Sequence, residues 1–251
     1  MLSKNQVKYI HSLRIGKFRD EYRVFTVEGG KLVDELIGSS YKIHQIFATS
    51  SWIQSHHAKI ASINIDTQEI TDVELTKISN LVTPNEVFAL VAYPDREIPV
   101  IKEPGDILLV LDCIQDPGNL GTIVRTADWF GIRNIICSPD TVDIYNPKVV
   151  QATMGSIFRV NIFYKPLKDF LEDIAKSHTV YGTTVSGENL FKTELTFPAV
   201  FVIGNESKGI SPGLYPAITR KISIPGGSSG TESLNAGIAA GIVMAEVCRR
   251  R

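Results

Sequence analysis

The first 93 residues alternate short apolar runs typical of strands with stretches of helical periodicity, which predicts a small α/β domain. A polar helical pattern opens the chain over residues 1–14. Thr71 and Glu74 have the spacing of a capping box and predict a helix start there. The strand-like runs are 23–29, 42–50 and 86–93, and the helical runs are 30–38 and 71–80, with a polar stretch ending near Ile63.

Residues 94–105 lack any periodicity and are rich in proline and charged side chains, which is typical of a linker. We therefore predict a first domain over residues 1–93, a linker over 94–105 and a second domain over 106–251.

The second domain repeats a pattern of apolar strand, glycine-bearing loop and helix. Continuous apolar strands that alternate with helices predict a parallel sheet covered on both faces. Ligands bind at the carboxyl ends of the strands in such sheets. The strand-like runs are 106–114, 133–138, 160–164, 179–185, 199–204 and 221–225, with helices expected near 122–131, Val149, 167–177 and from about Thr231.

Composition narrows the functional classes. The 251 residues are 43% hydrophobic and 21% charged, enough for real cores, and no apolar run is long enough to span a membrane. The N-terminus does not resemble an export signal, so we expect a soluble cytoplasmic protein. Three scattered cysteines and five histidines suggest neither a disulfide framework nor a metal site.

Net charge is −1, yet residues 1–23 carry six Lys or Arg against two acidic residues, and the chain ends in three arginines. These basic segments can contact phosphates. They are equally compatible with a solvated helix face and a basic helix C-terminus.

The first of three glycine-bearing loops spans 116–122 and leads into a predicted helix that carries Arg125. A guanidinium there can hold a phosphate through two parallel hydrogen bonds. An Arg125–Asp128 pair on the helix surface is the alternative.

The second loop spans 202–210 and follows a fully apolar strand. It lacks the Gly-Lys-Ser/Thr order of a P-loop, and the chain has no GxGxxG after a strand, so triphosphate and dinucleotide sites are disfavoured. Glu206 can bind a ribose or an amine, or can be an ordinary acidic residue at a helix start.

The third loop spans 222–237 and leads into a helix rich in glycine and alanine. Ser229 and Glu232 form a capping-box pattern before Ser233 and Asn235. Because each interior glycine costs roughly 1 kcal/mol of helix propensity, another chain segment, a subunit or a cofactor must approach this helix closely.

Together the loops 116–131, 202–211 and 222–242 resemble the three motifs of the SpoU (TrmH-like) branch of the SPOUT RNA methyltransferases, in the order and spacing of that family. Residues 25–36 and 80–91 also resemble the substrate-binding domain that precedes the catalytic domain in many members.

The resemblance implies a deep trefoil knot in the C-terminal α/β domain, S-adenosylmethionine as cofactor, structured RNA as substrate and homodimers formed through the knot region. By the same resemblance, the catalytic candidates are Asn119, Arg125, Glu206, Ser233 and Asn235. The implied cofactor-binding residues are Thr183, Ile203, Gly204, Asn205, Ile224, Pro225, Ser233 and Leu234.

Methyl transfer to a ribose 2′-hydroxyl requires alignment and loss of a proton, and it requires no metal. A guanidinium is a poor proton acceptor, so we favour Arg125 as the residue that orients a phosphate and stabilises the developing alkoxide. Two positions depart from the family pattern: Gly226 replaces a common methionine, and Ala236-Gly237 replaces Val-Ser. The first can loosen a cofactor wall and the second lies beside the expected dimer face.

Three alternatives compete with a large-subunit rRNA methyltransferase. A tRNA 2′-O-methyltransferase differs only in substrate, and the separate first domain favours rRNA by analogy. A non-catalytic RNA-binding or ribosome-assembly protein could keep the fold, although the retained motif residues argue against it. A serine hydrolase built on Ser233 lacks a GxSxG elbow and a histidine partner.

Overall fold

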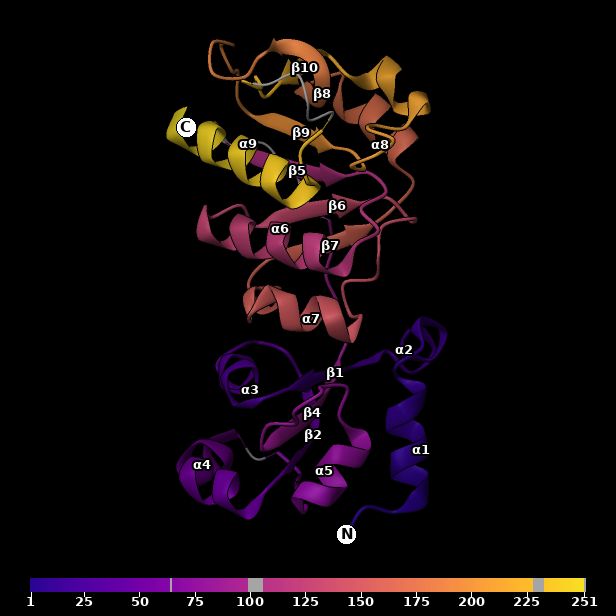
Figure 1. Ribbon diagram of the computed structural model, residues 1–251, viewed down its shortest axis with the longest axis vertical. Helices are drawn as coiled ribbons and strands as arrows, with labels where there is room; N and C mark the ends of the chain where they lie inside the picture. The colour runs from indigo at the N-terminus through magenta and orange to yellow at the C-terminus, as the bar shows by residue number, and fades with distance from the viewer. Residues whose placement is uncertain (64, 99–105, 228–232, 251) are drawn as a thin grey trace. The chain divides into compact units, whose positions relative to one another are not determined.

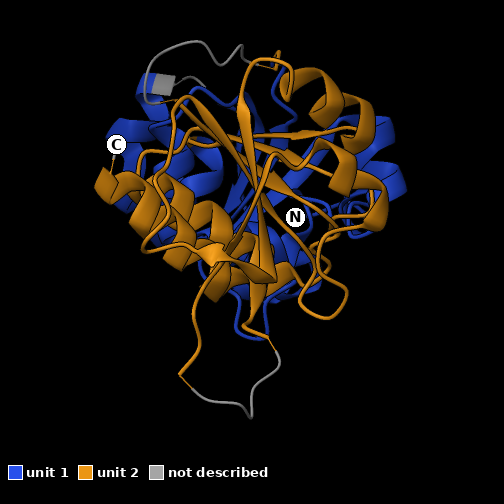
Figure 2. Ribbon diagram, turned by 90° about the horizontal axis from the view of Figure 1, so that it is seen from above, with its two compact units in different colours: residues 1–96, 143–158 blue, residues 97–142, 159–251 orange. Residues whose placement is uncertain are grey.

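The computed structural model describes residues 1–63, 65–98, 106–227 and 233–250, which form two compact units. Unit 1 comprises Met1–Arg96 and Asp143–Phe158, and unit 2 comprises Glu97–Val142 and Arg159–Arg251 (Figure 2). The chain therefore passes between the units three times. The sequence division into 1–93, 94–105 and 106–251 did not anticipate that residues 143–158 fold with unit 1.

Unit 1 is built on a four-stranded mixed sheet with the order β1-β4-β2-β3. β4 pairs antiparallel with β1 and β2, and β3 pairs parallel with β2. Its strands are β1 (Val24–Glu28), β2 (Ile43–Ala48), β3 (Thr67–Glu69) and β4 (Val87–Ala92), and its first five helices are α1 (Lys4–Ser12), α2 (Gly16–Tyr22), α3 (Gly30–Ile37), α4 (Ser50–Ile63) and α5 (Asp72–Ile78).

The capping box predicted at α5 is present, with Thr71 and Glu74 each bonded to the other's backbone amide. The polar stretch before Ile63 forms α4, a helix that periodicity alone did not reveal. Its buried contact is Trp52, whose side chain is almost fully enclosed. A single large aromatic anchors this otherwise polar helix, so no repeating apolar stripe marks it in the sequence.

Residues 143–158 carry α7 (Pro147–Thr153) and a 3-10 turn, η1 (Ser156–Phe158). The Tyr41 hydroxyl donates to the Ile157 carbonyl at 2.9 Å, and the rings of Phe25 and Tyr145 lie 4.6 Å apart. Arg19 of α2 is only 3% exposed and donates to Asp143 Oδ2 through Nε at 2.9 Å and Nη2 at 2.5 Å. This buried ion pair ties α2 to the segment.

Unit 2 contains a six-stranded sheet with the order β10-β8-β9-β5-β6-β7, and every neighbouring pair is parallel. The predicted fold class, a small α/β domain followed by a parallel-sheet α/β domain, is confirmed. The strands are β5 (Ile107–Leu111), β6 (Asn134–Cys137), β7 (Asn161–Tyr164), β8 (Thr179–Asn189), β9 (Ala199–Ile203) and β10 (Arg220–Ser223).

Helices lie on both sides of this sheet (Figure 2). One face packs α8 (Leu167–Ile174) and the 3-10 turn η2 (Pro212–Ala217) against buried valines and leucines of β5, β8 and β9. α6 (Pro117–Trp129) and α9 (Ala236–Arg250) pack against each other (Figure 1). Because β5 and β9 are buried along their whole length, their sequences are continuously apolar.

Two helix starts differ from the sequence prediction. α6 begins at Pro117, five residues early, because the Asp116 side chain caps it and proline suits the first helical position. α9 begins at Ala236, later than predicted. The predicted capping box at Ser229 and Glu232 and the earlier start at Thr231 lie outside the described residues, as do residues 99–105 of the predicted linker.

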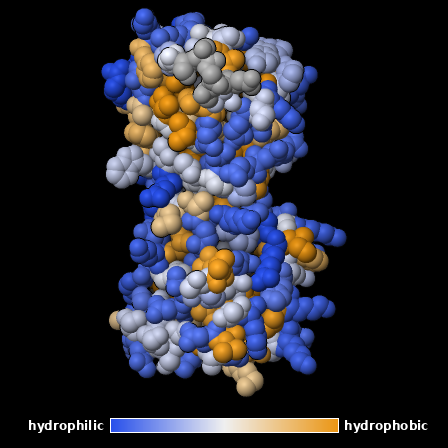
Figure 3. All heavy atoms as spheres, viewed as in Figure 1, coloured by the Kyte–Doolittle hydropathy of each residue, from blue (hydrophilic) through white to orange (hydrophobic). Residues whose placement is uncertain are grey.

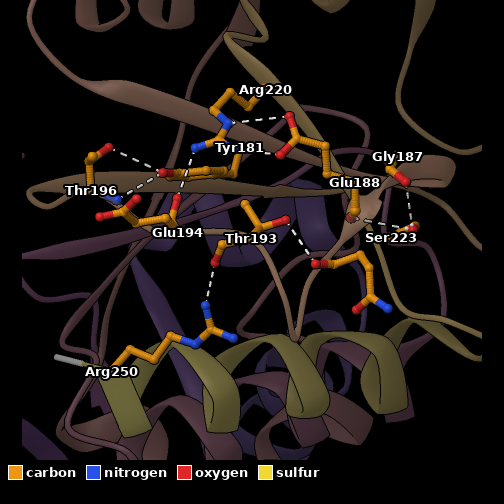
Figure 4. A network of polar contacts seen from close by, with 10 residues as sticks. Tyr181, Gly187, Glu188, Thr193, Glu194, Thr196, Arg220, Ser223 and Arg250 are labelled. Carbon is orange, nitrogen blue, oxygen red and sulfur yellow. Dashed lines mark hydrogen bonds and ion pairs between the residues drawn. The ribbon is translucent and has the colours of Figure 1, made fainter.

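A polar network fastens the end of α9 to the segment between β8 and β9 (Figure 4). Arg250 donates to the carbonyls of Thr193 and Phe191, and Arg220 of β10 donates to the Glu194 carbonyl at 2.8 Å. Arg220 also forms an ion pair with Glu188 of β8 at 2.5 Å. The Arg220 contacts join β10 to β8 and to the segment after it, and the Arg250 contacts join the end of α9 to the same segment.

Strand order does not by itself determine whether a chain is threaded through a loop, so the trefoil knot remains a prediction. No helix among residues 1–63, 65–98, 106–227 and 233–250 is long and apolar enough to span a membrane.

We predict that Arg19→Ala destabilises the protein by roughly 3 kcal/mol, because it leaves the partly buried Asp143 carboxylate without its partner. Urea denaturation followed by circular dichroism measures the change. Lys17→Ala is the control, since Lys17 is an exposed basic residue of the same helix, α2. Equal stability losses in both variants would contradict a special role for the buried pair.

Candidate active site

The three motif loops meet because of the strand order in unit 2. β5 and β9 are neighbours in register, with Leu111 opposite Ile203, so the segments that follow them leave the same edge of the sheet. Asn119 follows β5 on α6, and Glu206 follows β9. Asn235, just before α9, reaches the same place because α9 packs on α6.

Asn119 joins the three loops through both ends of its side-chain amide. Its Nδ2 donates to Glu206 Oε1 in a short hydrogen bond, and its Oδ1 accepts from Asn235 Nδ2 at 2.8 Å. Asn235 Oδ1 in turn accepts from the Ile238 amide at 3.2 Å and so caps α9. Three of the five catalytic candidates thus form one hydrogen-bonded chain.

The loop after β9 is fixed by Asn205 and two glycines. Asn205 and Gly209 exchange backbone hydrogen bonds at 3.0 and 2.9 Å, and the Asn205 side chain donates to the Cys113 carbonyl at 3.0 Å. At Gly204 a Cβ would overlap the backbone of Gly209 and Ile210, so only glycine fits there.

Asp112 and Cys113 directly follow β5, beside this loop. Asp112 Oδ2 accepts from the Ser211 amide at 2.7 Å, which ties the two segments together. Burial, together with the Asp112 carboxylate, raises the pKa of the Cys113 thiol. The thiol therefore stays protonated at neutral pH and is a poor nucleophile.

A cleft of about 1100 Å³ opens at the carboxyl ends of β9 and β10 and along β8. Its walls come from the segments 183–186, 203–210 and 224–227, together with residues at the start of α9. All eight predicted cofactor-binding residues line it, namely Thr183, Ile203, Gly204, Asn205, Ile224, Pro225, Ser233 and Leu234. Their contacts with a cofactor stay a prediction.

Sequence reasoning missed several residues of this cleft, and three of them carry polar or aromatic groups that bear on binding. Tyr215 and Lys221 line it as a pair, with the ammonium 4.8 Å from the ring centre. The third is Thr184, whose buried hydroxyl has no hydrogen-bond partner among the described residues. By contrast, the neighbouring Thr183 hydroxyl donates to the Val202 carbonyl. The two adjacent threonines can be told apart only by their side-chain hydrogen bonds, which the sequence does not reveal.

Arg125 lies on α6, one and a half turns beyond Asn119, and is exposed. It forms no ion pair or side-chain hydrogen bond with the parts of the chain that the structure describes. The alternative Arg125–Asp128 pair is wrong, because Asp128 accepts instead from Arg159 Nε at 2.8 Å. Arg125 is not part of the cleft wall, and Ser233 lines the cleft without joining the Asn119 chain.

The glycines of α9 are explained in part by packing within the chain. A Cβ at Gly237 would lie 3.5 Å from Thr122 Cβ of α6 and 3.2 Å from Asn235 Oδ1, and one at Gly241 would lie 3.9 Å from Thr126. The close neighbour expected from the helix composition is therefore α6, at least at Gly237.

This arrangement matches a known family. The sequence model of the family described as "SpoU rRNA Methylase family" matches residues 106–245, which is more than half of the chain. The chain belongs to the SpoU rRNA methylase family. The resemblance predicted from the three loops is confirmed, and an MRM3-like substrate-binding domain also matches residues 4–89.

Relatives of this SpoU protein include 23S rRNA (guanosine(2553)-2′-O)-methyltransferase RlmP of Bacillus subtilis, which is 26% identical and is matched over 96% of both chains. A putative TrmH-family RNA methyltransferase from Porphyromonas gingivalis is 36% identical over the full length of both chains, with a TM-score of 0.89. An S-adenosylmethionine-bound rRNA methyltransferase from Sinorhizobium meliloti is 30% identical, with 99% and 96% coverage and a TM-score of 0.88.

The residues of the cleft fit S-adenosylmethionine on two observations. The cofactor has many polar atoms, and the unpartnered Thr184 hydroxyl supplies a hydrogen-bonding group in the wall. Apolar residues such as Ile203 and Ile224 line the same cleft, as in most small-molecule sites.

We predict that Thr184→Val weakens S-adenosylmethionine binding roughly 3- to 10-fold while leaving the ligand-free protein equally or more stable, because an unsatisfied buried hydroxyl is removed. Calorimetric titration and thermal unfolding measure the two effects.

Thr26→Val is the matched control. Thr26 is the other buried threonine hydroxyl without a partner among the described residues, and it lies in unit 1. Its replacement should affect stability similarly and leave cofactor affinity unchanged. Wild-type affinity in Thr184→Val would remove Thr184 from the cofactor site.

Proposed function

We propose that this protein transfers a methyl group from S-adenosylmethionine to a ribose 2′-hydroxyl of structured RNA, with large-subunit rRNA as the substrate class. The observation that carries the proposal is the meeting of Asn119, Glu206 and Asn235 beside the cleft, in a chain of the SpoU family. Two similarities favour rRNA over tRNA. Residues 4–89 match an MRM3-like substrate-binding domain, and the chain is similar over 96% of its length to RlmP, a 23S rRNA methyltransferase.

When bound in the cleft, S-adenosylmethionine would supply a methyl group that passes from its sulfur to the ribose oxygen, with the hydroxyl proton leaving to solvent water. The chain's own residues perform alignment. The Asn119 amide fixes the loops after β5 and β9 and the start of α9, so the cleft and α6 keep a set geometry. The exposed Ser233 at the cleft is placed to contact the nucleotide.

Arg125 is the residue best suited to the RNA. Its guanidinium has no partner among the described residues, so it can bind a backbone phosphate without first breaking an ion pair. A fixed positive charge near the reacting oxygen also stabilises developing alkoxide. In this proposal Arg125 orients and stabilises, and the proton passes onward from the hydroxyl to another acceptor.

We predict that Arg125→Ala lowers methyl transfer at least about 100-fold without changing the affinity for S-adenosylmethionine. Transfer of labelled methyl groups into unmodified 23S rRNA and, separately, into tRNA measures the reaction, and mapping the product locates the ribose. Arg125→Lys keeps the charge but loses the two-pronged geometry, so it should recover only part of the activity.

Arg133→Ala is the control, since Arg133 is an exposed arginine of the same unit beyond α6. Label in rRNA that disappears only in the Arg125 variants supports the proposal. Label in tRNA alone favours the tRNA alternative, and binding of RNA without transfer by the wild-type protein favours a non-catalytic role.

We further propose that the protein acts in the cytoplasm as a homodimer formed through α9 and α6. The outer face of α9 presents Ile238, 54% exposed, with Ile242 and Ala245 on the following turns. α6, which packs on α9, carries Trp129 at 85% exposure. Apolar side chains gather over α9 in the space-filling view (Figure 3). A second copy of the same face would cover this apolar surface.

We predict that Ile238→Glu converts a dimer of the wild-type protein into a monomer, because it places charge in the centre of the proposed interface. Light scattering coupled to gel filtration gives the mass. Val73→Glu, at an exposed valine of α5, is the control and should leave the mass unchanged. A monomeric wild-type protein would exclude the proposed dimer.

A further inference from the structure

The helices α1 and α2 of unit 1 expose a group of aromatic rings. Tyr9 of α1 lies 5.2 Å from Tyr22 of α2, and Phe18 stacks on Tyr22 with ring centres 6.2 Å apart and planes 15° apart. Tyr22 is 43% exposed and Ile15, at the start of α2, is 56% exposed. Hydrophobic residues are visible at the surface over α2 (Figure 3).

Only part of this aromatic group belongs to the core of unit 1. α1 and the turn after it contribute Ile10 and Leu13, which are almost fully buried, and Tyr9 packs against the same core. α2 contributes Arg19 through its ion pair with Asp143. The contact between Tyr9 and Tyr22 also joins α1 to α2, yet Tyr22 remains exposed.

Basic side chains flank the rings. Lys8 precedes Tyr9 and Lys17 precedes Phe18, and both are exposed. Neither lysine forms an ion pair with any described residue of the chain. Arg14 donates to the Ser79 carbonyl at 2.8 Å, and Arg23 lies over the Tyr93 ring at 4.8 Å. Against these four basic residues stand two exposed acidic residues of α2, Asp20 and Glu21, so the balance of α1 and α2 is basic in a chain whose net charge is −1.

We propose that Tyr9, Phe18, Tyr22, Lys8 and Lys17, the α1–α2 surface, bind a single-stranded segment of the RNA substrate. Bases stack on exposed aromatic rings, and lysines neutralise the phosphates between them. Protein-binding surfaces are depleted in lysine, whereas two exposed lysines without an ion pair among the described residues adjoin these rings in sequence. The inference rests on the proposed function and specifies where unit 1 holds the RNA.

The α1–α2 surface positions the substrate and takes no part in bond making. Its loss should raise KM for RNA and leave kcat unchanged, because the interactions are the same in the bound substrate and in the transition state. Cofactor affinity should also be unchanged, since all of the cleft residues belong to unit 2.

The test measures fluorescence anisotropy with a labelled single-stranded RNA of mixed sequence and with a transcript of 23S rRNA, from 50 to 200 mM salt. In Lys8→Ala/Lys17→Ala, the slope of log Kd against log salt should fall by roughly 1 to 2. Tyr22→Ala should weaken binding about 5-fold or more, and Tyr22→Phe should restore it, because phenylalanine keeps the stacking ring.

The matched control is Lys31→Ala/Lys42→Ala, which removes two exposed lysines of unit 1 outside the α1–α2 surface. Thermal unfolding confirms that all variants fold. An equal loss of RNA affinity in the control would overturn the inference. RNA affinity equal to that of the wild type in the α1–α2 variants would also overturn it, and that result is expected if this surface binds a protein instead.

Methyl transfer by the same variants separates this inference from the proposed function. A wild-type protein that methylates no RNA contradicts the proposed function. A wild-type protein that methylates rRNA, with α1–α2 variants of unchanged KM, contradicts only the role of this surface.

Discussion

One side-chain amide, that of Asn119, determines the geometry of the candidate active site. It donates to Glu206 and accepts from Asn235, so a single residue on α6 fixes the loop after β9 and the start of α9. Only an amide offers a donor and an acceptor at this length. An aspartate would place a second carboxylate against Glu206 and lose the donor. The contact therefore joins the cleft wall and the cap of α9 to α6, on which α9 packs.

The fold of unit 2 was readable because buried parallel strands such as β5 and β9 are continuously apolar and the intervening helices show a clear stripe. The helix α4 was not, since its buried anchor is the lone Trp52. The early start of α6 was missed because Pro117 and Gly118 suit a turn as well as a first helical turn. Residues 143–158 could not be assigned to unit 1, because the Arg19–Asp143 pair spans 124 positions.

The candidate site, too, was predictable from the sequence only in part. Motif spacing located Asn119, Glu206 and Asn235, and strand order explains why they meet. Arg125 was placed on a helix correctly, but spacing favoured a pair with Asp128 that the structure gives to Arg159. Thr184 carries no signal in the sequence beside Thr183, because what distinguishes them is the partner of each hydroxyl. Local patterns identify residue types, and tertiary contacts decide which polar atoms remain available.

The segment 143–158 makes each unit discontinuous in sequence. A single proteolytic cut near residue 96 cannot release either unit intact. Residues 143–158 would stay attached to unit 2, while Phe25 and Tyr41, which contact Tyr145 and Ile157, left with the other fragment. Exchange of the first domain between relatives by recombination would meet the same obstacle. A transplanted residue range 1–96 must match the recipient's segment 143–158 at Arg19 and Tyr41, so the two pieces of unit 1 are constrained to change together.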